Sequence, residues 1–167
     1  MVMELIGFMR DELQKEFEGV VRLTNKGEYK PVKMYIGSLP DAEPGAEEFA
    51  SILFLPMAGA DENSEERVGL KLVFCVYVPE DGNISESEEA SRDLMNALSI
   101  TKNFIRKHKS LNEYFRYSEG SLSWSYIEDY PNQTGPAFYA AINVEYRTPI
   151  ISEVTKAEVK AYGSSYE

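Results

Sequence analysis

The clearest hydrophobic pattern lies in residues 67–109, where an apolar strand precedes a long amphipathic helix. Alternate positions over residues 68–78 carry apolar side chains: Val68, Leu70, Leu72, Phe74, Val76 and Val78. The positions between them also become apolar from Val73 onward, which is typical of a central strand covered on both faces. Turn-forming residues then follow, from Pro79 to Asn83. The pattern therefore predicts that this strand lies at the centre of a sheet.

The second half of this stretch predicts a helix that begins at Ser85. Ser85 and Glu88 have the spacing of a capping box, in which each side chain bonds a free backbone N–H group. Acidic residues lie at the start and basic residues at the end, which suits the helix dipole. The apolar positions recur at helical spacing: Ala90, Leu94, Ala97, Leu98, Thr101 and Ile105. A helix of this size, about 34 Å long, can cover a whole sheet face.

Periodicity also predicts an N-terminal helix and five further strands. The helix has apolar residues at Val2, Leu5, Ile6, Met9, Leu13 and Phe17, and it ends near Gly19. Strands are expected at residues 32–36, 49–55 and 111–117, around Trp124, and at residues 138–146. Two acidic connections are predicted between strands, a loop over residues 37–48 and a long hairpin connection over residues 56–66.

This order of elements predicts an α+β fold: a mostly antiparallel or mixed sheet with the long helix and the N-terminal helix packed on it. Residues 1–149 are expected to form one domain. Residues 150–167 are weakly patterned and are expected to form a C-terminal tail that is partly disordered or held by a partner.

The net charge of the chain argues against one class of function, general nucleic-acid binding. The chain has 28 acidic and 17 basic residues, a net charge of −11, so it lacks the excess of cations that a general nucleic-acid binder needs. Solubility is the simplest explanation of this charge. No apolar run is long enough to span a bilayer. Glu4 and Asp11 interrupt the N-terminal apolar positions, so no signal peptide and an intracellular, soluble protein are expected.

The residue types that carry chemistry are scarce. Cys75 is the only cysteine and lies in an apolar strand, which excludes an internal disulfide and a cysteine-based metal site. His108 is the only histidine, at the basic end of the long helix, where a surface role is expected. Helix capping explains the acidic cluster near residue 86, and no phosphate-binding, dinucleotide-binding or nucleophile-elbow motif occurs. We therefore expect no catalytic, cofactor-binding or metal-binding residues and no enzymatic activity.

Aromatic residues are concentrated near the C-terminal end: Trp124, Tyr126, Tyr130, Phe138 and Tyr139. Trp124 alternates with serines, so at least partial burial of its side chain is expected. Such a cluster could stack on bases, but the acidic charge favours a core or a protein interface instead.

The order of several local patterns resembles the tail terminator, or tail-completion, proteins of long-tailed bacteriophages and prophages. The resemblance covers residues 32–149. It rests on the segment from Tyr35 to Pro40 before an acidic loop, on the strand ending in Tyr77-Val78 before the long helix, and on later aromatic strands around Trp124 that end at Pro149.

This resemblance implies a structural virion protein that forms a ring, usually a hexamer. The ring would cap the tail tube and meet the head–tail connector, so the implied partners are other copies of the chain, the major tail tube protein and the connector protein. Its implied location is the host cytoplasm during assembly and then the virion tail. Asp61, Glu62, Glu65 and Glu66 are the expected contact or lumen residues, because an acidic lumen would let DNA slide without binding.

Two other interpretations remain open. The chain could be an acidic binding or inhibitor module that masks a basic partner and stays monomeric without it. It could also be a different head–tail joining protein of the same particle. An enzyme is disfavoured because no constellation of catalytic residues is present.

Overall fold

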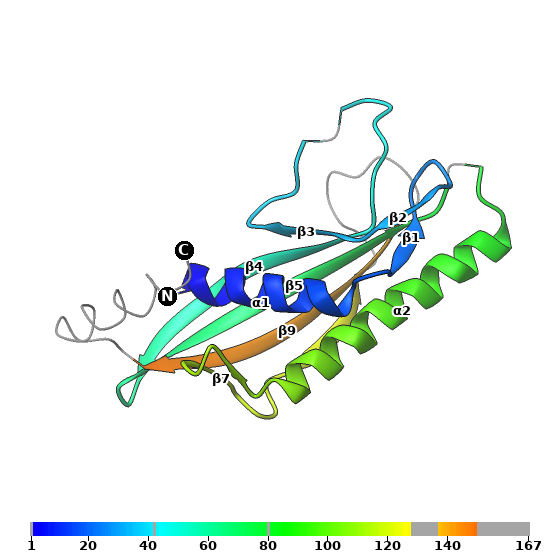
Figure 1. Ribbon diagram of the computed structural model, residues 1–167. Coiled ribbons are helices and arrows are strands. Elements are labelled where there is room, and N and C mark those ends of the chain that lie inside the picture. The colour runs from blue at the N-terminus through cyan, green and yellow to red at the C-terminus, as the bar shows by residue number, and fades with distance from the viewer. Residues whose placement is uncertain (1, 42, 80, 128–136, 150–167) are drawn as a thin grey trace.

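The computed structural model describes residues 2–41, 43–79, 81–127 and 137–149. The predicted tail at residues 150–167 and Tyr130 lie outside these residues. The elements are α1 (Val2–Glu16), β1 (Val21–Leu23), β2 (Tyr29–Pro31), β3 (Lys33–Ile36), β4 (Ser51–Glu62), β5 (Glu65–Tyr77), α2 (Ile84–Lys107), β6 (Ser110–Leu111), β7 (Phe115–Tyr117), β8 (Ser123–Ile127) and β9 (Ala137–Pro149). Both helices lie across the same face of a curved sheet (Figure 1).

The main sheet is mixed and centres on β5 and β9. Its strand order is β3-β4-β5-β9-β7-β6, and β8 pairs with β9 on the edge that β7 also uses. β3 and β4 are parallel, whereas the other pairs are antiparallel. β1 and β2 form a separate two-stranded sheet. The prediction of an α+β fold with a mixed sheet and two packed helices is confirmed.

The core lies between the helices and the sheet face that they cover, which we call the inner face. α1 buries Leu5, Ile6, Met9 and Leu13, all of which were predicted to face inward. α2 adds Leu94, Leu98 and Ile105 at helical spacing. Burying one large apolar side chain stabilises a fold by about 1.5–3 kcal/mol. The apolar residues that recur at helical spacing in the sequence are therefore the ones that pack the helices against the sheet.

The opposite face, which we call the outer face, changes character along the strands. Towards the C-terminal end of β5, its side chains are buried, among them Val73, Cys75 and Tyr77. Burial of Cys75 and an apolar covering of both faces were predicted for this strand. Towards the N-terminal end, the outer face carries Lys71 and Arg67, which are only partly buried. Among the described residues, this half of the outer face is polar and partly exposed.

The predicted long connection over residues 56–66 is wrong. β4 continues to Glu62 and β5 begins at Glu65, so only Asn63 and Ser64 form the turn. Both turn residues have positive φ, 50° and 67°, as in the tight hairpin turn that matches the strand twist. The acidic, glycine-containing sequence reads locally as a loop. Backbone pairing with β5, itself paired with β9, overrides that preference.

The predicted start of the long helix is also corrected. α2 begins at Ile84, and the Oδ1 atom of Asn83 accepts a hydrogen bond of 2.9 Å from the backbone N–H of Glu86. Asn83, not Ser85, is therefore the N-cap residue. Both residue types suit this position, but the chain leaves its extended conformation at Asn83.

We expect Asn83→Ala to lower the free energy of unfolding by about 1 kcal/mol, because one N–H group of the first helical turn loses its acceptor. Ser85→Ala is the matched control and should change the stability much less. Urea denaturation followed by circular dichroism measures both values. A larger loss for the Ser85 variant would contradict the assigned N-cap.

Candidate assembly surfaces

The four acidic residues singled out in the sequence meet at the tip of the β4–β5 hairpin. Asp61 pairs across the strands with Glu66, and Glu62 pairs with Glu65. Directly paired residues share a sheet face, and neighbouring pairs alternate between faces. Asp61 and Glu66 therefore lie on the inner side of the tip, whereas Glu62 and Glu65 lie on the outer side. The prediction that these residues contact a partner or line a lumen stays a prediction.

A row of arginines crosses the outer face just below this tip. Arg67 of β5 pairs with Arg147 of β9, which pairs in turn with Arg116 of β7. Glu65 forms ion pairs with Arg116 and, at 3.8 Å, with Arg147, and Glu62 lies 3.0 Å from Arg67. Two of the four predicted acidic residues are therefore partly neutralised within the chain.

Sequence reasoning missed the arginine row because its members are far apart along the chain. No local motif connects positions 67, 116 and 147. Only the register of three neighbouring strands brings them into one line, and sequence periodicity does not determine that register.

One edge of the sheet is open over the outer part of β4. β3 pairs only with Ser51–Phe54, so within the described residues the next part of β4 has a partner strand on its β5 side alone. The side chains from Pro56 to Glu62 are exposed, including Met57 at 57%. An open edge offers unpaired N–H and C=O groups to another strand. The bulge between Pro56 and Ala58 and the acidic tip restrict which strands can pair there.

The opposite edge of the sheet is formed by β8, which carries two half-exposed aromatic residues. Trp124 is 49% exposed and Tyr126 is 45% exposed, and their paired partners in β9 place both on the inner side of the sheet. Among the described residues, β8 pairs only with β9, so its outer backbone edge is also open. Exposed Trp and Tyr side chains are frequent at the centres of protein interfaces.

The predicted aromatic cluster is divided by the sheet. Phe138 and Tyr139 are consecutive in β9, so their side chains lie on opposite faces. Tyr139 packs with Cys75 and Tyr77 on the outer face, away from Trp124. Trp124 is 49% exposed at the sheet edge, so the burial expected from its alternation with serines is only half realised.

The surface beside β8 is basic. The ammonium group of Lys102 lies 5.4 Å from the centroid of the Trp124 ring, and Arg106 and Lys107 follow on exposed positions of the last helical turn. Lys109 comes next and forms an ion pair with Glu119. Cations near a helix C-terminus stabilise the helix, which explains part of this cluster. It still gives one edge a positive surface in a chain with net charge −11.

A cleft of about 620 Å³ lies on the outer face under the segment that joins β3 to β4. Tyr35, Leu53 and Tyr77 contribute to its lining, together with acidic side chains such as Glu47 and Glu48. The Oε2 atom of Glu48 is buried without a hydrogen-bond partner, and burial raises the pKa of this carboxyl group. Burial also raises the pKa of Tyr77. The cleft is therefore acidic with a partly apolar floor.

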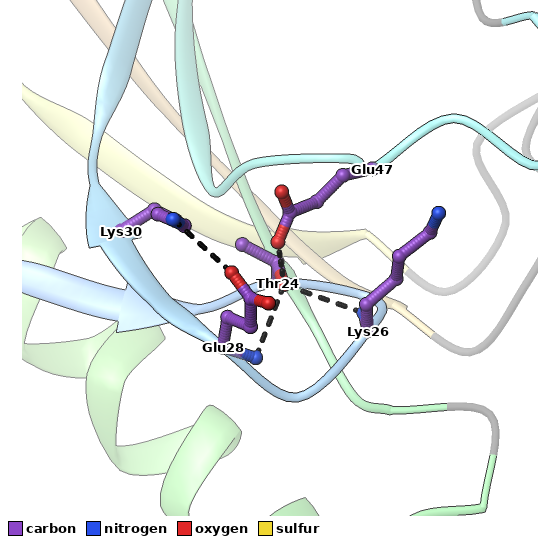
Figure 2. Close-up of polar contacts among 5 residues, drawn as sticks. All are labelled: Thr24, Lys26, Glu28, Lys30 and Glu47. Atoms are coloured by element: carbon purple, nitrogen blue, oxygen red, sulfur yellow. Dashed lines mark hydrogen bonds and ion pairs between the residues drawn. The ribbon is translucent and has the colours of Figure 1, made fainter.

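The segment that joins β3 to β4 is hydrogen-bonded near its C-terminal end to the turn after β1, as Figure 2 shows for Glu47 and Thr24. The hydroxyl group of Thr24, a fully buried residue, donates a hydrogen bond of 2.9 Å to the carboxylate of Glu47 and accepts weaker bonds from the N–H groups of Lys26 and Glu28. Asn25 adds a bond of 2.7 Å, because its Oδ1 atom accepts from the N–H group of Glu48. These bonds fix one wall of the cleft.

The residues with potential for chemistry lie apart from one another in the described part of the chain. The ring of His108 packs on Phe104 with centroids 4.5 Å apart, and Cys75 is buried in β5. Within the described ranges, no three His, Cys, Asp or Glu side chains gather as they would around a metal ion. No helix in this part of the chain has the length and apolar character needed to cross a membrane.

Comparison of the sequence with protein-family models finds no match. A search of curated proteins likewise finds no significant relative. The geometry described above is therefore the main basis for a functional proposal, together with the resemblance noted in the sequence.

Proposed function

We propose that this protein is a structural component of a phage or prophage tail, a tail terminator that acts as an oligomeric ring. The ring, hexameric by resemblance, stops growth of the tail tube and presents a surface to the head–tail connector. Its partners are its own copies, the major tail tube protein and the connector protein. In this role the protein has no enzymatic activity and does not recognise a specific nucleic acid.

One structural observation supports this proposal: among the residues that the structure describes, the sheet has two different open edges on opposite sides. The β4 edge ends in an acidic tip, whereas the β8 edge carries exposed aromatic residues beside a basic surface. A contact between two different edges is heterologous, and repeated heterologous contacts form a closed ring when the rotation between copies permits it. Each single contact can be weak, because many simultaneous contacts act together in the assembled ring.

The experiment that tests this function is deletion of the gene from the phage or prophage that encodes it. We expect tails of uncontrolled length, or tails that never join heads, in negative-stain electron micrographs. Expression of the intact gene from a plasmid should restore normal particles. Infectious particles with normal tails from the deletion strain would overturn the proposal. Normal tails are also the result expected if the protein is an acidic inhibitor module, because deleting the gene for such a module would not change tail length.

A further inference from the structure

We infer that β8 of one copy pairs with the open part of β4 of the next copy, so that the sheets of neighbouring subunits are continuous. This inference rests on the proposed ring, and it names the surfaces that form the contact. The occupant of each open edge is a second copy of this chain. Three features of the described residues support it: the direction of the strands, the distribution of charge and the position of exposed apolar side chains.

The strand directions are compatible with such a contact. β4 is antiparallel to β5, β5 to β9 and β9 to β8, so β4 and β8 run in opposite directions. If successive copies keep the same orientation in the ring, the β4 strand of a neighbour meets β8 in an antiparallel arrangement. Antiparallel pairing gives well-aligned hydrogen bonds and extends the prevailing pattern of the sheet.

The charges on the two edges are complementary in this arrangement. Antiparallel pairing brings the end of the neighbour's β4, with Asp61 and Glu62, beside the start of β8. The start of β8 is next to Lys102, and the last turn of α2 with Arg106 and Lys107 continues the basic surface. The acidic tip of one copy therefore approaches the basic end of α2 in the next. Complementary charges also speed association and disfavour incorrect orientations.

Both edges of the proposed contact carry exposed apolar side chains. Met57 lies in the open part of β4, and Trp124 and Tyr126 lie on β8. Aromatic and Met side chains are enriched at protein interfaces, where burying them supplies much of the affinity. The open part of β4 and the five residues of β8 are offset along the strands. In closed arrangements of strands, such an offset is accommodated by tilting the strands relative to the axis.

Cysteine cross-linking between two single variants tests this contact. Ser125 of β8 and Ala60 of β4 are both exposed, and their paired partners place both on the outer face. Ser125→Cys and Ala60→Cys proteins are mixed and treated with a thiol reagent that spans about 5–8 Å, the range of opposite and diagonal cross-strand side chains. Ser123→Cys mixed with the same Ala60→Cys protein provides a second pair on the same face, because Ser123 is the diagonal neighbour of Ala60 when Ser125 faces Ala60 in an antiparallel register. The buried Cys75 serves as the background in the unmodified protein.

We expect the mixture to give a covalent dimer, and each single variant alone to give none. A variant that carries both cysteines should give a ladder of larger products. Gln14→Cys, at an exposed position of α1, is the control that should not cross-link to either edge. High salt should reduce the yield, because it screens the complementary charges.

Failure of the mixtures to cross-link over a range of protein concentrations would overturn the contact. Dimers from a single variant alone would also overturn it, because they indicate a symmetric contact between identical edges. The cross-linking experiment and the gene deletion test the two proposals separately. Abnormal tails without cross-linking would retain the tail function and reject this interface, whereas cross-linking with normal tails would retain the interface and reject the tail function.

Discussion

Replacing Phe74 with alanine is expected to lower the free energy of unfolding by about 3–5 kcal/mol, the usual cost of removing a buried aromatic side chain. Phe74 is 1% exposed and lies on the inner face of β5, paired with Ile52 of β4 and Ala140 of β9. Strands on both sides and helices above limit how far the surroundings can close the resulting cavity. Natural domains are stable by about 5–15 kcal/mol, so the variant would be only marginally folded.

Trp124→Ala is the matched control for this prediction. Trp124 is a larger aromatic residue, but it is half exposed at the edge of the sheet, so its removal should cost much less stability. Urea denaturation followed by circular dichroism measures both variants without relying on the fluorescence of this single tryptophan. A Trp124 variant as unstable as the Phe74 variant would show that the half-exposed edge residue belongs to the core.

The sequence predicted elements whose signal is local. The periodic apolar residues of α1 and α2 identify both helices and their buried faces, because each helix repeats its pattern over several turns. The alternation in β5 likewise marks the central strand. The N-cap was placed two residues late because Ser85 and Asn83 are both good capping residues and differ only in backbone conformation.

The hairpin and the arginine row could not be predicted in the same way. Gly59 and Asp61 have low strand propensity, yet they continue β4 because β5 supplies their hydrogen bonds. The line formed by Arg67, Arg147 and Arg116 depends on pairing between strands that are distant in sequence. The same non-local information determines which edges remain open, so the candidate assembly surfaces become visible only in the fold.

The second large effect on stability is expected at Glu65, the residue that forms ion pairs with two members of the arginine row. We expect Glu65→Gln to lower the free energy of unfolding by about 1–2 kcal/mol at low ionic strength. The carboxylate forms ion pairs with Arg116 and Arg147, and exposed ion pairs are worth about 0–1 kcal/mol each. Its loss also leaves directly opposed arginines with less compensation, and like charges that face each other across strands are destabilising.

Salt provides the test of this electrostatic origin. The three arginine side chains are 41–60% exposed, so solvent and ions reach them readily. Added salt screens their repulsion, and the difference between Glu65→Gln and the unmodified protein should therefore become smaller. Glu66→Gln removes the same charge from the inner side of the hairpin tip, away from the arginine row, and should cost less. Equal losses for the two variants, or a loss for Glu65→Gln that is independent of salt, would show that packing rather than charge makes Glu65 important.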